Sequence, residues 1–284
     1  MLYKLSTSSR QWSITEPQVM GILNCTPDSF YSVSRNLRER DIAFCVERMV
    51  DEGASIIDVG GVSTRPGACI ASEQEEMHRL RTALAAVRKA LPDTILSVDT
   101  FRPDVARMAV EEFGADIIND VSEGGEAYQA EQEAGTDEGR CHANGIITEV
   151  ARLGAAYVLM AIQPTLAKTL SAFQQKVCLL QAHGVRSIIL DPGYGFGKDL
   201  RQNYALMSSQ QAIAELFPDM PLLVGVSRKR MVWQLLGCTP EEALNGTTAL
   251  HMAALAHGAA ILRAHDVKQA AETIRIYQQL AMDR

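Results

Sequence analysis

The sequence predicts an α/β protein, a single-domain (β/α)8 TIM barrel, because short apolar segments alternate eight times with helix-like segments. The apolar segments are rich in branched residues, as is typical of strands buried on both faces of a parallel sheet. No linker rich in proline or serine interrupts the 284 residues, and a (β/α)8 barrel typically takes about 250. An open doubly wound sheet is the alternative, although such a sheet would not require the polar residues at the strand ends to converge.

The predicted elements follow in order from local periodicity. Residues 1–16 are expected to form an N-terminal cap or a short edge ribbon, and residues 17–284 the barrel. The predicted strands cover residues 18–23, 55–59, 94–98, 116–118, 156–160, 187–190, 222–226 and 259–262. Helical periodicity covers residues 41–52, 73–90, 103–113, 145–153, 165–183, 201–217, 240–257 and 267–281.

Several helix ends carry recognisable signals. Gly53 closes the first helix, Pro103 suits a first helical turn, and Thr239 is placed to cap the helix that starts at residue 240. Residues 123–144 are rich in Glu, Gly and Ala with almost no aliphatic side chains, which favours an exposed loop or a fraying helix.

The composition argues against several classes of partner. The formal net charge is −7 and the pI is near 5.4, which disfavours a non-specific nucleic-acid surface or an anionic-membrane surface. The six cysteines are scattered without a C-x-x-C pair, as in a protein with reduced thiols. No apolar run reaches membrane-spanning length and the first residues carry no signal-peptide core, so we expect a cytoplasmic protein without nucleic-acid or membrane partners.

Polar side chains follow seven of the eight predicted strands, at the point where each strand ends. In a barrel these positions share one mouth, so residues distant in sequence become neighbours. Any one of them could instead cap a helix or satisfy a turn, and their repetition is what favours a binding site. The exception is the strand that ends at Met160. The polar strand ends are Asn24, Ser63-Thr64-Arg65, Asp99, Asn119, Asp191, Ser227-Arg228-Lys229, and Arg263 with His265.

Three of these residues suit a flat heterocycle. Asp99, Asn119 and Asp191 offer hydrogen-bond acceptors, with amide donors from Asn119. A carboxylate that accepts two parallel donors from an aminopyrimidine edge recognises it by charge and by direction.

The remaining polar residues suit an anion and a metal ion. Arg65, Arg263 and His265 supply donors for an oxyanion such as a phosphate. Asn24 is a candidate Mg2+ ligand, because magnesium often binds through few protein oxygens together with substrate phosphates.

The glycine-rich segment at residues 188–198 reads I-I-L-D-P-G-Y-G-F-G-K. It is not a P-loop, because its spacing differs and Asp199 stands where serine or threonine should follow Lys198. It is not a dinucleotide fingerprint either, because its third glycine comes one residue early. No serine–base–acid triad and no H-E-x-x-H motif is apparent in the sequence.

Seven motifs together resemble dihydropteroate synthase, of the pterin-binding (β/α)8 enzymes. They occur in the family's order and extend over nearly the whole chain from Met20, so the joint match is specific. They read M-G-I-L-N-C-T-P-D-S-F (20–30), D-V-G-G-V-S-T-R-P-G (58–67), S-V-D-T (97–100), I-N-D-V (118–121), L-D-P-G-Y-G-F-G-K (190–198), G-V-S-R-K-R (225–230) and R-A-H-D (263–266).

The resemblance implies a role for each strand-end residue. A pterin would be held by Asp99, Asn119, Asp191 and Lys229, with Met160 lining its slot. Pyrophosphate and Mg2+ would be held by Asn24, Arg65, Arg263 and His265. The aminobenzoate site would be shaped by Thr64, Pro66, Phe196 and Ser227, and Ser63 and Gly225 complete the expected substrate-binding set. The residues expected to act in catalysis are Asp99, Asp191, Lys229, Arg263 and His265.

By the same resemblance, the reaction joins 6-hydroxymethyl-7,8-dihydropterin pyrophosphate to 4-aminobenzoate, releases pyrophosphate and forms 7,8-dihydropteroate for folate synthesis. Pyrophosphate leaves a methylene attached to an electron-rich ring, so an SN1-like path through a pterin cation is expected. Asp99 and Asp191 would stabilise the cation, and Mg2+, Arg263 and His265 the departing anion.

Two other functions remain open from the sequence. A methyltetrahydrofolate-binding methyltransferase domain has no pyrophosphate to bind, so Arg65, Arg263 and His265 weigh against it. A catalytically inactive pterin-binding paralogue would keep the fold and lose the reaction. Members of the family are usually dimers, so a homodimer is expected, with residues 240–257 and 267–281 as candidate interface helices.

Several features depart from the family's pattern. Val62 stands where the family usually has glutamate, and Ala161 stands where histidine normally follows Met160. The run Y-S-V-S-R-N at residues 31–36 replaces the usual S-D-G-G, and residues 123–144 are longer and more acidic than the usual connection. The expected ligand positions are unchanged, so these departures bear on aminobenzoate affinity and inhibitor response more than on the reaction.

Overall fold

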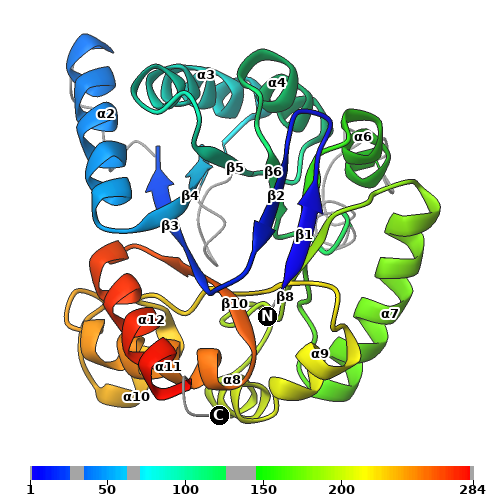
Figure 1. Ribbon diagram of the computed structural model, residues 1–284, viewed down its shortest axis with the longest axis vertical. Coiled ribbons are helices and arrows are strands. Elements are labelled where there is room, and N and C mark those ends of the chain that lie inside the picture. Colours follow the sequence, from blue (N-terminus) through cyan, green and yellow to red (C-terminus); the bar gives the residue numbers. More distant parts are fainter. Residues whose placement is uncertain (1, 26–34, 63–70, 126–144, 282–284) are drawn as a thin grey trace.

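The computed structural model of the chain describes residues 2–25, 35–62, 71–125 and 145–281 (Figure 1). Its barrel strands are β3 (Gln18–Asn24), β4 (Ala54–Gly60), β5 (Ile95–Asp99), β6 (Ile117–Asp120), β7 (Ala156–Met160), β8 (Ile188–Asp191), β9 (Leu222–Val224) and β10 (Ala259–Ala264). All eight are parallel and close in the order β10-β3-β4-β5-β6-β7-β8-β9. The predicted (β/α)8 barrel is therefore confirmed, and the open sheet is wrong.

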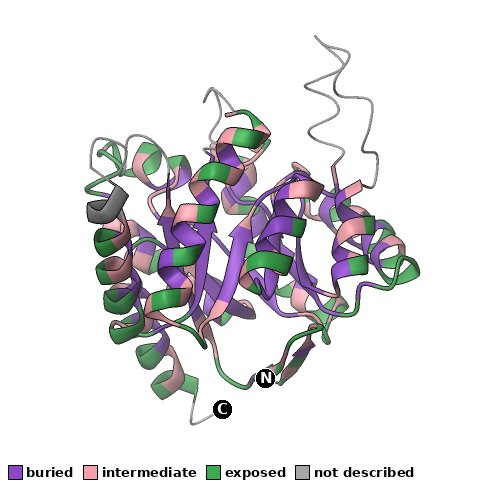
Figure 2. Ribbon diagram, turned by 90° about the horizontal axis from the view of Figure 1, so that it is seen from above, coloured by how far each residue is buried: buried purple, intermediate pink, exposed green. Residues whose placement is uncertain are grey.

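The helices form a ring outside the strands (Figure 1). They are α2 (Arg35–Asp51), α3 (Glu73–Ala90), α4 (Pro103–Phe113), α6 (Gly145–Leu153), α7 (Leu166–Ala182), α8 (Leu200–Ser208), α9 (Gln211–Leu216), α10 (Arg230–Leu236), α11 (Leu244–Ala256) and α12 (Val267–Ala281). Their inner faces are buried against the strands and their outer faces are exposed (Figure 2). None of the helices in the described ranges combines the length and the apolar character needed to span a membrane.

A two-stranded antiparallel hairpin, β1 (Tyr3–Ser6) and β2 (Gln11–Ile14), lies outside the barrel sheet. Its buried residues Leu5 and Ile14 join the apolar cluster that fills the inside of the barrel. The Ser6 N–H donates to Ser187 Oγ at 2.8 Å, and Ser187 Oγ donates to the Ser6 carbonyl at 2.9 Å. Because Ser187 directly precedes β8, the hairpin covers the amino-terminal ends of the strands and leaves the carboxyl ends as the mouth.

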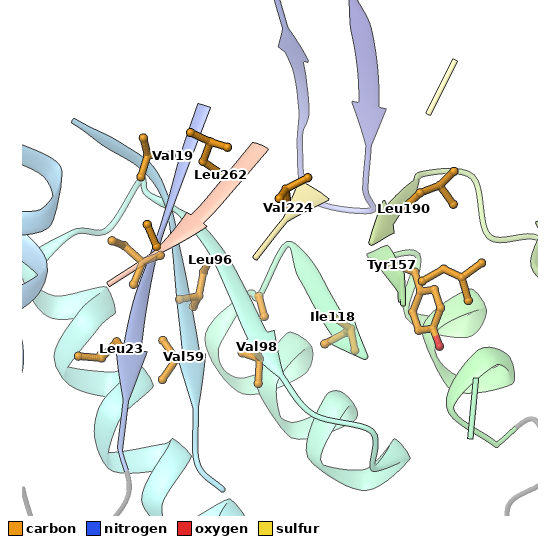
Figure 3. Packing of buried hydrophobic residues seen from close by; sticks show 14 of the residues in the cluster. Val19, Leu23, Val59, Leu96, Val98, Ile118, Tyr157, Leu190, Val224 and Leu262 are labelled. Carbon is orange, nitrogen blue, oxygen red and sulfur yellow. The ribbon is translucent and has the colours of Figure 1, made fainter. Parts of the chain in front are cut away.

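Successive strand residues alternate between two apolar layers, as the pleat requires. Val59, Val98, Ile118 and Leu262 belong to the layer that packs between the strands and the surrounding helices (Figure 3). Residues one position away, such as Ile117, belong to the inner layer with the hairpin. The barrel interior at the hairpin end is thus a packed apolar core, whereas the interior at the mouth end carries polar side chains such as Asp58 and Asn119.

Helices α3 and α4 have the predicted bounds, and each has a clear signal at its ends. The hydroxyl of Ser72 accepts from the Glu75 N–H and so caps α3, which covers residues 73–90 as expected. Pro103 starts α4, which ends at Gly114 in a left-handed conformation. These local signals decide the boundaries without help from the rest of the fold.

The structure differs from the predicted helices in three places. The predicted helix 201–217 is two helices, α8 and α9, because the buried Gln210 accepts from Tyr194 Oη at 2.9 Å and donates to the Ala254 carbonyl at 3.0 Å. Helix α2 begins at Arg35 instead of residue 41, and α10 was not predicted.

Thr239 does not cap a helix. The Glu242 N–H bonds the Thr239 carbonyl at 3.2 Å and the Ala243 N–H bonds the Pro240 carbonyl at 3.4 Å, so this segment forms tight turns of the i to i+3 type. Helix α11 starts only at Leu244, and its N-terminal flanking residue Ala243 makes no side-chain cap.

Candidate active site

The pleat of the strands brings the predicted strand-end residues together. In β5 and β6, Val98 and Ile118 face the helices, so Asp99 and Asn119, each one position further, face the inside of the barrel (Figure 3). Asp99 and Asn119 are also partners in the register of β5 and β6. The same alternation turns Asp191 and Arg263 inward beside the outward-facing Leu190 and Leu262. Polar residues from six of the eight barrel strands therefore share the interior at the mouth: Asn24, Asp58, Asp99, Asn119, Asp191 and Arg263.

Arg263 lies between two carboxylates. Its Nε donates to Asp58 Oδ2 at 2.7 Å, its Nη2 also lies 2.6 Å from that oxygen, and Nη2 donates to Asp99 Oδ2 at 2.8 Å. Burial alone would lower the pKa of Arg263, but Asp58 and Asp99 raise it above its ordinary value. The guanidinium is thus permanently charged and held in one plane.

Asp99 is a carboxyl group at the mouth whose pKa is altered by its surroundings. Burial raises its pKa to about 7, although Arg263 acts in the opposite direction, and the negative charge of Asp58 adds to the increase. A carboxyl group that changes its charge near neutral pH suits a site in which charge develops on a bound ring.

Asp191 and Lys229 form the second charged group. Asp191 is buried, its Oδ1 accepts from the Gly193 N–H at 2.8 Å, and burial raises its pKa, with Lys229 opposing that change. Lys229 donates to the Tyr194 carbonyl at 2.6 Å, and burial lowers its pKa to about 8. Its Nζ lies 4.6 Å from the centre of the Phe196 ring, a cation–π contact.

Gly225 links the two charged groups. A Cβ atom at this position would lie 3.7 Å from Lys229 Nζ and 3.8 Å from Arg263 Cβ. The lack of a side chain keeps the space between the lysine and the arginine open. Met160, the predicted lining residue, is fully buried at the end of β7, and its register partner is Asp191.

The glycine loop after β8 is shaped by packing and not by phosphate binding. Gly193 has a φ of +67°, and a Cβ there would lie 2.2 Å from the Ala161 carbonyl oxygen. Lys198 donates to the carbonyls of Ala161, Gly193 and Phe196 at 3.1, 3.0 and 3.2 Å. Burial lowers the pKa of Lys198 to about 8. This lysine, which had no clear role in the sequence, fastens the loop that carries Phe196.

Two loops of the mouth are joined by Arg228, one of the polar strand-end residues, and Asp266, a pairing that the sequence patterns did not predict. Arg228 forms a bidentate pair with Asp266, with Nε to Oδ2 at 2.9 Å and Nη2 to Oδ1 at 2.6 Å. Arg228 has a φ of +52°, a conformation that non-glycine residues seldom adopt. The pair holds Ser227 beside His265, whose backbone N–H and Nδ1 both lie 3.2 Å from Ser227 Oγ.

Asn24 lies half-buried at the end of β3. A Cβ on Gly60 would lie 3.6 Å from Asn24 Oδ1 and 3.7 Å from Asp99 Cβ, so this glycine leaves the space between the two residues open. Among the described residues, no cluster of three or more His, Cys, Asp or Glu side chains could hold a metal ion. A metal bound here would depend on Asn24 and on oxygens supplied by a ligand.

Several predicted residues lie outside the described part of the chain. Ser63, Thr64, Arg65 and Pro66 belong to this group, as do residues 31–34 and 126–144 of the segments that depart from the family's pattern. Their predicted roles stay predictions.

The sequence reading gave no role to Asp58, although the structure places it at the centre of the mouth. A signal was present, because a charged residue in the middle of an apolar strand must find partners inside the barrel. No such signal exists for the pairing of Arg228 with Asp266, because it depends on the contact of two loops. Asp120, next to Asn119, points the other way, since it accepts from Tyr157 Oη, from the Ser122 N–H and from the Gly124 N–H.

Several known proteins are similar to this chain in both sequence and fold. Residues 20–265 match the family described as pterin binding enzyme. The dihydropteroate synthase of Escherichia coli K12 is 36% identical over 284 aligned residues, which cover 97% of this chain and 95% of that protein. The dihydropteroate synthase of Coxiella burnetii in complex with pteroic acid has a TM-score of 0.80 at 32% identity, covering 99% of this chain and 100% of that chain. That of Xanthomonas albilineans with 4-aminobenzoic acid has a TM-score of 0.81 at 31% identity, covering 99% of each chain. This chain belongs to the family of pterin-binding enzymes that contains the dihydropteroate synthases.

Proposed function

We propose that this protein is a dihydropteroate synthase, which condenses 6-hydroxymethyl-7,8-dihydropterin pyrophosphate with 4-aminobenzoate and releases pyrophosphate. The observation that carries the proposal is the arrangement of acceptors and cations in one mouth, Asp99, Asn119 and Asp191 facing Lys229 and Arg263. The dihydropteroate synthase of Coxiella burnetii was solved with pteroic acid, and that of Xanthomonas albilineans with 4-aminobenzoic acid. Pteroic acid is the oxidised form of the proposed product, and 4-aminobenzoic acid is the proposed second substrate.

The acceptors fit a pterin by their number and their charge. A pterin edge presents an amino group and ring N–H groups, which need buried acceptors because an unpaired donor inside a protein is costly. Asp191 and Asn119 are both buried, and Asp99 lies beside Asn119 on the neighbouring strand. The Lys229 ammonium beside Asp191 supplies a donor for a ring nitrogen or carbonyl oxygen.

The chemistry follows an SN1-like path. When the C–O bond to pyrophosphate breaks, the bonding electrons leave with pyrophosphate and positive charge develops on the pterin methylene and its ring. The carboxylates of Asp99 and Asp191 stabilise that charge in a site with little water, where electrostatic interactions are strong. The amine of 4-aminobenzoate then forms the new C–N bond and loses a proton, so no protein nucleophile is required.

The departing pyrophosphate is assigned to the arginine side of the mouth. Arg263 uses Nε and Nη2 for Asp58 and Asp99, which leaves Nη1 directed by those contacts for the anion. His265 is exposed and lies next to Ser227, so it can donate to the same anion. Mg2+ would neutralise charge on the leaving group, and Asn24 Oδ1 is the oxygen that would hold it, in keeping with the preference of magnesium for oxygen ligands.

The reaction can be tested directly. The purified protein, incubated with the pterin pyrophosphate, 4-aminobenzoate and Mg2+, should form 7,8-dihydropteroate and pyrophosphate in equal amounts, measured by chromatography with mass detection. A chain that binds the pterin but forms no product would be an inactive paralogue, and the proposal would then be wrong. Methyl transfer from methyltetrahydrofolate to a cobalamin acceptor, assayed in parallel, should be undetectable.

A homodimer is part of the proposal. Leu235 and Leu236 of α10 and Ile276 and Leu280 of α12 are more than half exposed, although large apolar side chains are usually covered. These helices flank α11, which was a candidate interface element from the sequence. Size-exclusion chromatography with light scattering should give twice the mass of 31.0 kDa, and a monomer at micromolar concentration would contradict this assignment.

A further inference from the structure

Asp58 is a fully buried carboxylate in β4 that the proposed reaction does not use. Its neighbour Val59 faces the helices, so Asp58 faces the inside of the barrel (Figure 3). Its register partner on β5 is Ser97, which donates to Asp58 Oδ1 at 2.5 Å. A buried charge is tolerated only when it has several partners, and Asp58 has partners from three other strands.

One oxygen of Asp58 holds a residue from each half of the site. Oδ2 accepts from Asn119 Nδ2 at 3.1 Å, and it also accepts from Arg263 Nε at 2.7 Å. Asn119 belongs to the group assigned to the pterin, and Arg263 belongs to the group assigned to pyrophosphate. The two side chains lie on β6 and β10, which are not neighbours in the barrel.

The chemistry of a carboxylate fixes how these two side chains are oriented. An ionised carboxylate only accepts hydrogen bonds, so Asn119 must turn its NH2 group toward Asp58 and its carbonyl oxygen away. For the same reason Arg263 keeps the edge formed by Nε and Nη2 against Asp58. The donors and acceptors that remain for a substrate are therefore set by Asp58, whose own oxygens are bonded to Ser97, Asn119 and Arg263.

We propose that Asp58 is a positioning residue that couples the pterin half of the site to the pyrophosphate half. The inference rests on the proposed function, since it needs both ligand groups to bind in this mouth. When the pterin orders Asn119, the shared oxygen orders Arg263 as well, so each ligand should strengthen the binding of the other. Without the shared anion, each half would have to be ordered separately.

The variant that tests this proposal is Asp58→Asn. Its carbonyl can still accept from Asn119 and Arg263, and its NH2 group can donate to Ser97 Oγ, so the barrel is expected to fold while the charge is lost. We expect kcat/KM for the pterin pyrophosphate to fall about 10- to 100-fold, the range typical of residues that orient ligand-binding groups. KM for 4-aminobenzoate should change less than twofold, because Asp58 orients neither Phe196 nor Ser227.

The matched control is Asp116→Asn at the opposite end of the barrel. Asp116 is equally buried and also interacts with arginines, with Arg10 at 3.1 Å and Arg88 at 3.5 Å. This variant should lower the melting temperature and leave KM and kcat unchanged. If Asp58→Asn behaves in the same way, Asp58 is a structural residue only and the proposal is overturned.

Ligand binding separates this inference from the proposed function. Calorimetric titration of 6-hydroxymethylpterin should give a tighter Kd in the presence of pyrophosphate and Mg2+ than without them, and Asp58→Asn should reduce that ratio to about one. If the unmodified protein binds these probes but makes no product, the proposed function fails while the coupling is still measured. Equal ratios in the two proteins would overturn the role of Asp58.

A double-mutant cycle provides a second test. The two substitutions are Asn119→Ala and Arg263→Lys, made singly and together in the otherwise unmodified chain. Because both residues depend on the same carboxylate, kcat/KM of the double variant should be at least fivefold higher than multiplying the two separate effects would give. This cycle does not depend on the folding of Asp58→Asn. Multiplicative effects would show that the two halves are independent and would contradict the proposal.

Discussion

Asp116 at the hairpin end of the barrel and Asp99 at the mouth differ in how well the protein stabilises their negative charge. At the end covered by the hairpin, Asp116 accepts from the Leu96 N–H at 3.0 Å and pairs with Arg10 and Arg88. At the mouth, burial raises the pKa of Asp99 to about 7 even though Arg263 is in contact with it. The charge of Asp116 is stabilised by hydrogen bonds and ion pairs within the protein. The charged form of Asp99 is disfavoured by burial, so a bound cation can stabilise it further.

A shifted pKa distinguishes the candidate active site from a structural ion pair in the same barrel. Both ends place charged groups on strand ends, so the presence of a charge does not decide the matter. The lysine at the mouth shows the same pattern as Asp99, because burial lowers the pKa of Lys229 to about 8. Groups such as Asp99 and Lys229, whose charged forms are disfavoured by burial in the ligand-free protein, are candidates for ligand binding or catalysis.

The largest expected effect comes from removing a charge at the mouth. Lys229→Ala and Asp191→Asn should each lower kcat by about 10²- to 10³-fold, comparable to the loss of one group that stabilises charge in a transition state. Circular dichroism should show the fold unchanged. Steady-state assays of product formation give the rates, and Asp116→Asn serves as the control with reduced stability and normal rates. A fully active Lys229→Ala or Asp191→Asn would show that the residue assignment is wrong.

The strand pattern was sufficient to predict the barrel and most of its mouth. Short apolar segments placed Asp99, Asn119 and Asp191 at strand ends, and a closed parallel barrel leaves only one place where they can meet. The bounds of α3, capped at Ser72, and of α4, which starts at Pro103, were predicted correctly, whereas the local cap signal at Thr239 was wrong. These are features that the chain specifies within a few residues.

The remaining features depend on contacts between distant residues. The break between α8 and α9 is fixed by Gln210, whose partner Ala254 lies 44 residues away. Asp58 and Arg263 are 205 residues apart, so no spacing rule could pair them. The sequence showed that polar groups converge at the mouth, but it could not show which of them bind each other and which remain for a ligand.

A core substitution at the closed end should affect stability alone. Ile14→Ala removes a fully buried side chain that joins the hairpin to the inner apolar cluster. We expect a loss of about 3 kcal/mol in the free energy of unfolding from the lost contacts and the cavity left behind. Urea denaturation measures this change, and kcat at 25 °C should be unchanged. Leu2→Ala, at a side chain that is 60% exposed, is the matched control and should be neutral. A drop in kcat for Ile14→Ala in the fully folded protein would mean that the two ends are coupled.

The pH dependence of the reaction should report on the two residues of the mouth whose pKa values are shifted toward neutral pH. Asp99 must be ionised to stabilise a cation, and its pKa of about 7 removes that charge as the pH falls. Lys229 must be protonated to donate, and its pKa of about 8 removes that charge as the pH rises. The profile of kcat/KM should therefore be bell-shaped with a maximum between pH 7 and 8, and should fall about tenfold per unit on each side. A flat profile from pH 6 to 9 would contradict these roles.

Stability should follow the opposite course over the same range. The pKa of Asp99 is raised from 3.8, so folding favours its neutral form, and that contribution to stability is lost as the pH rises through about 7. The pKa of Lys229 is lowered from 10.5, so its neutral form is also favoured, and that contribution is lost as the pH falls through about 8. Both groups are charged between pH 7 and 8, where the enzyme should be most active and the mouth least stable. Asp99→Asn should remove the first contribution, so its melting temperature should fall less than that of the unmodified protein between pH 5 and 8. If the two proteins lose stability equally over that range, ionisation of Asp99 does not destabilise the fold. The difference between Asp99 and Asp116 must then have another origin.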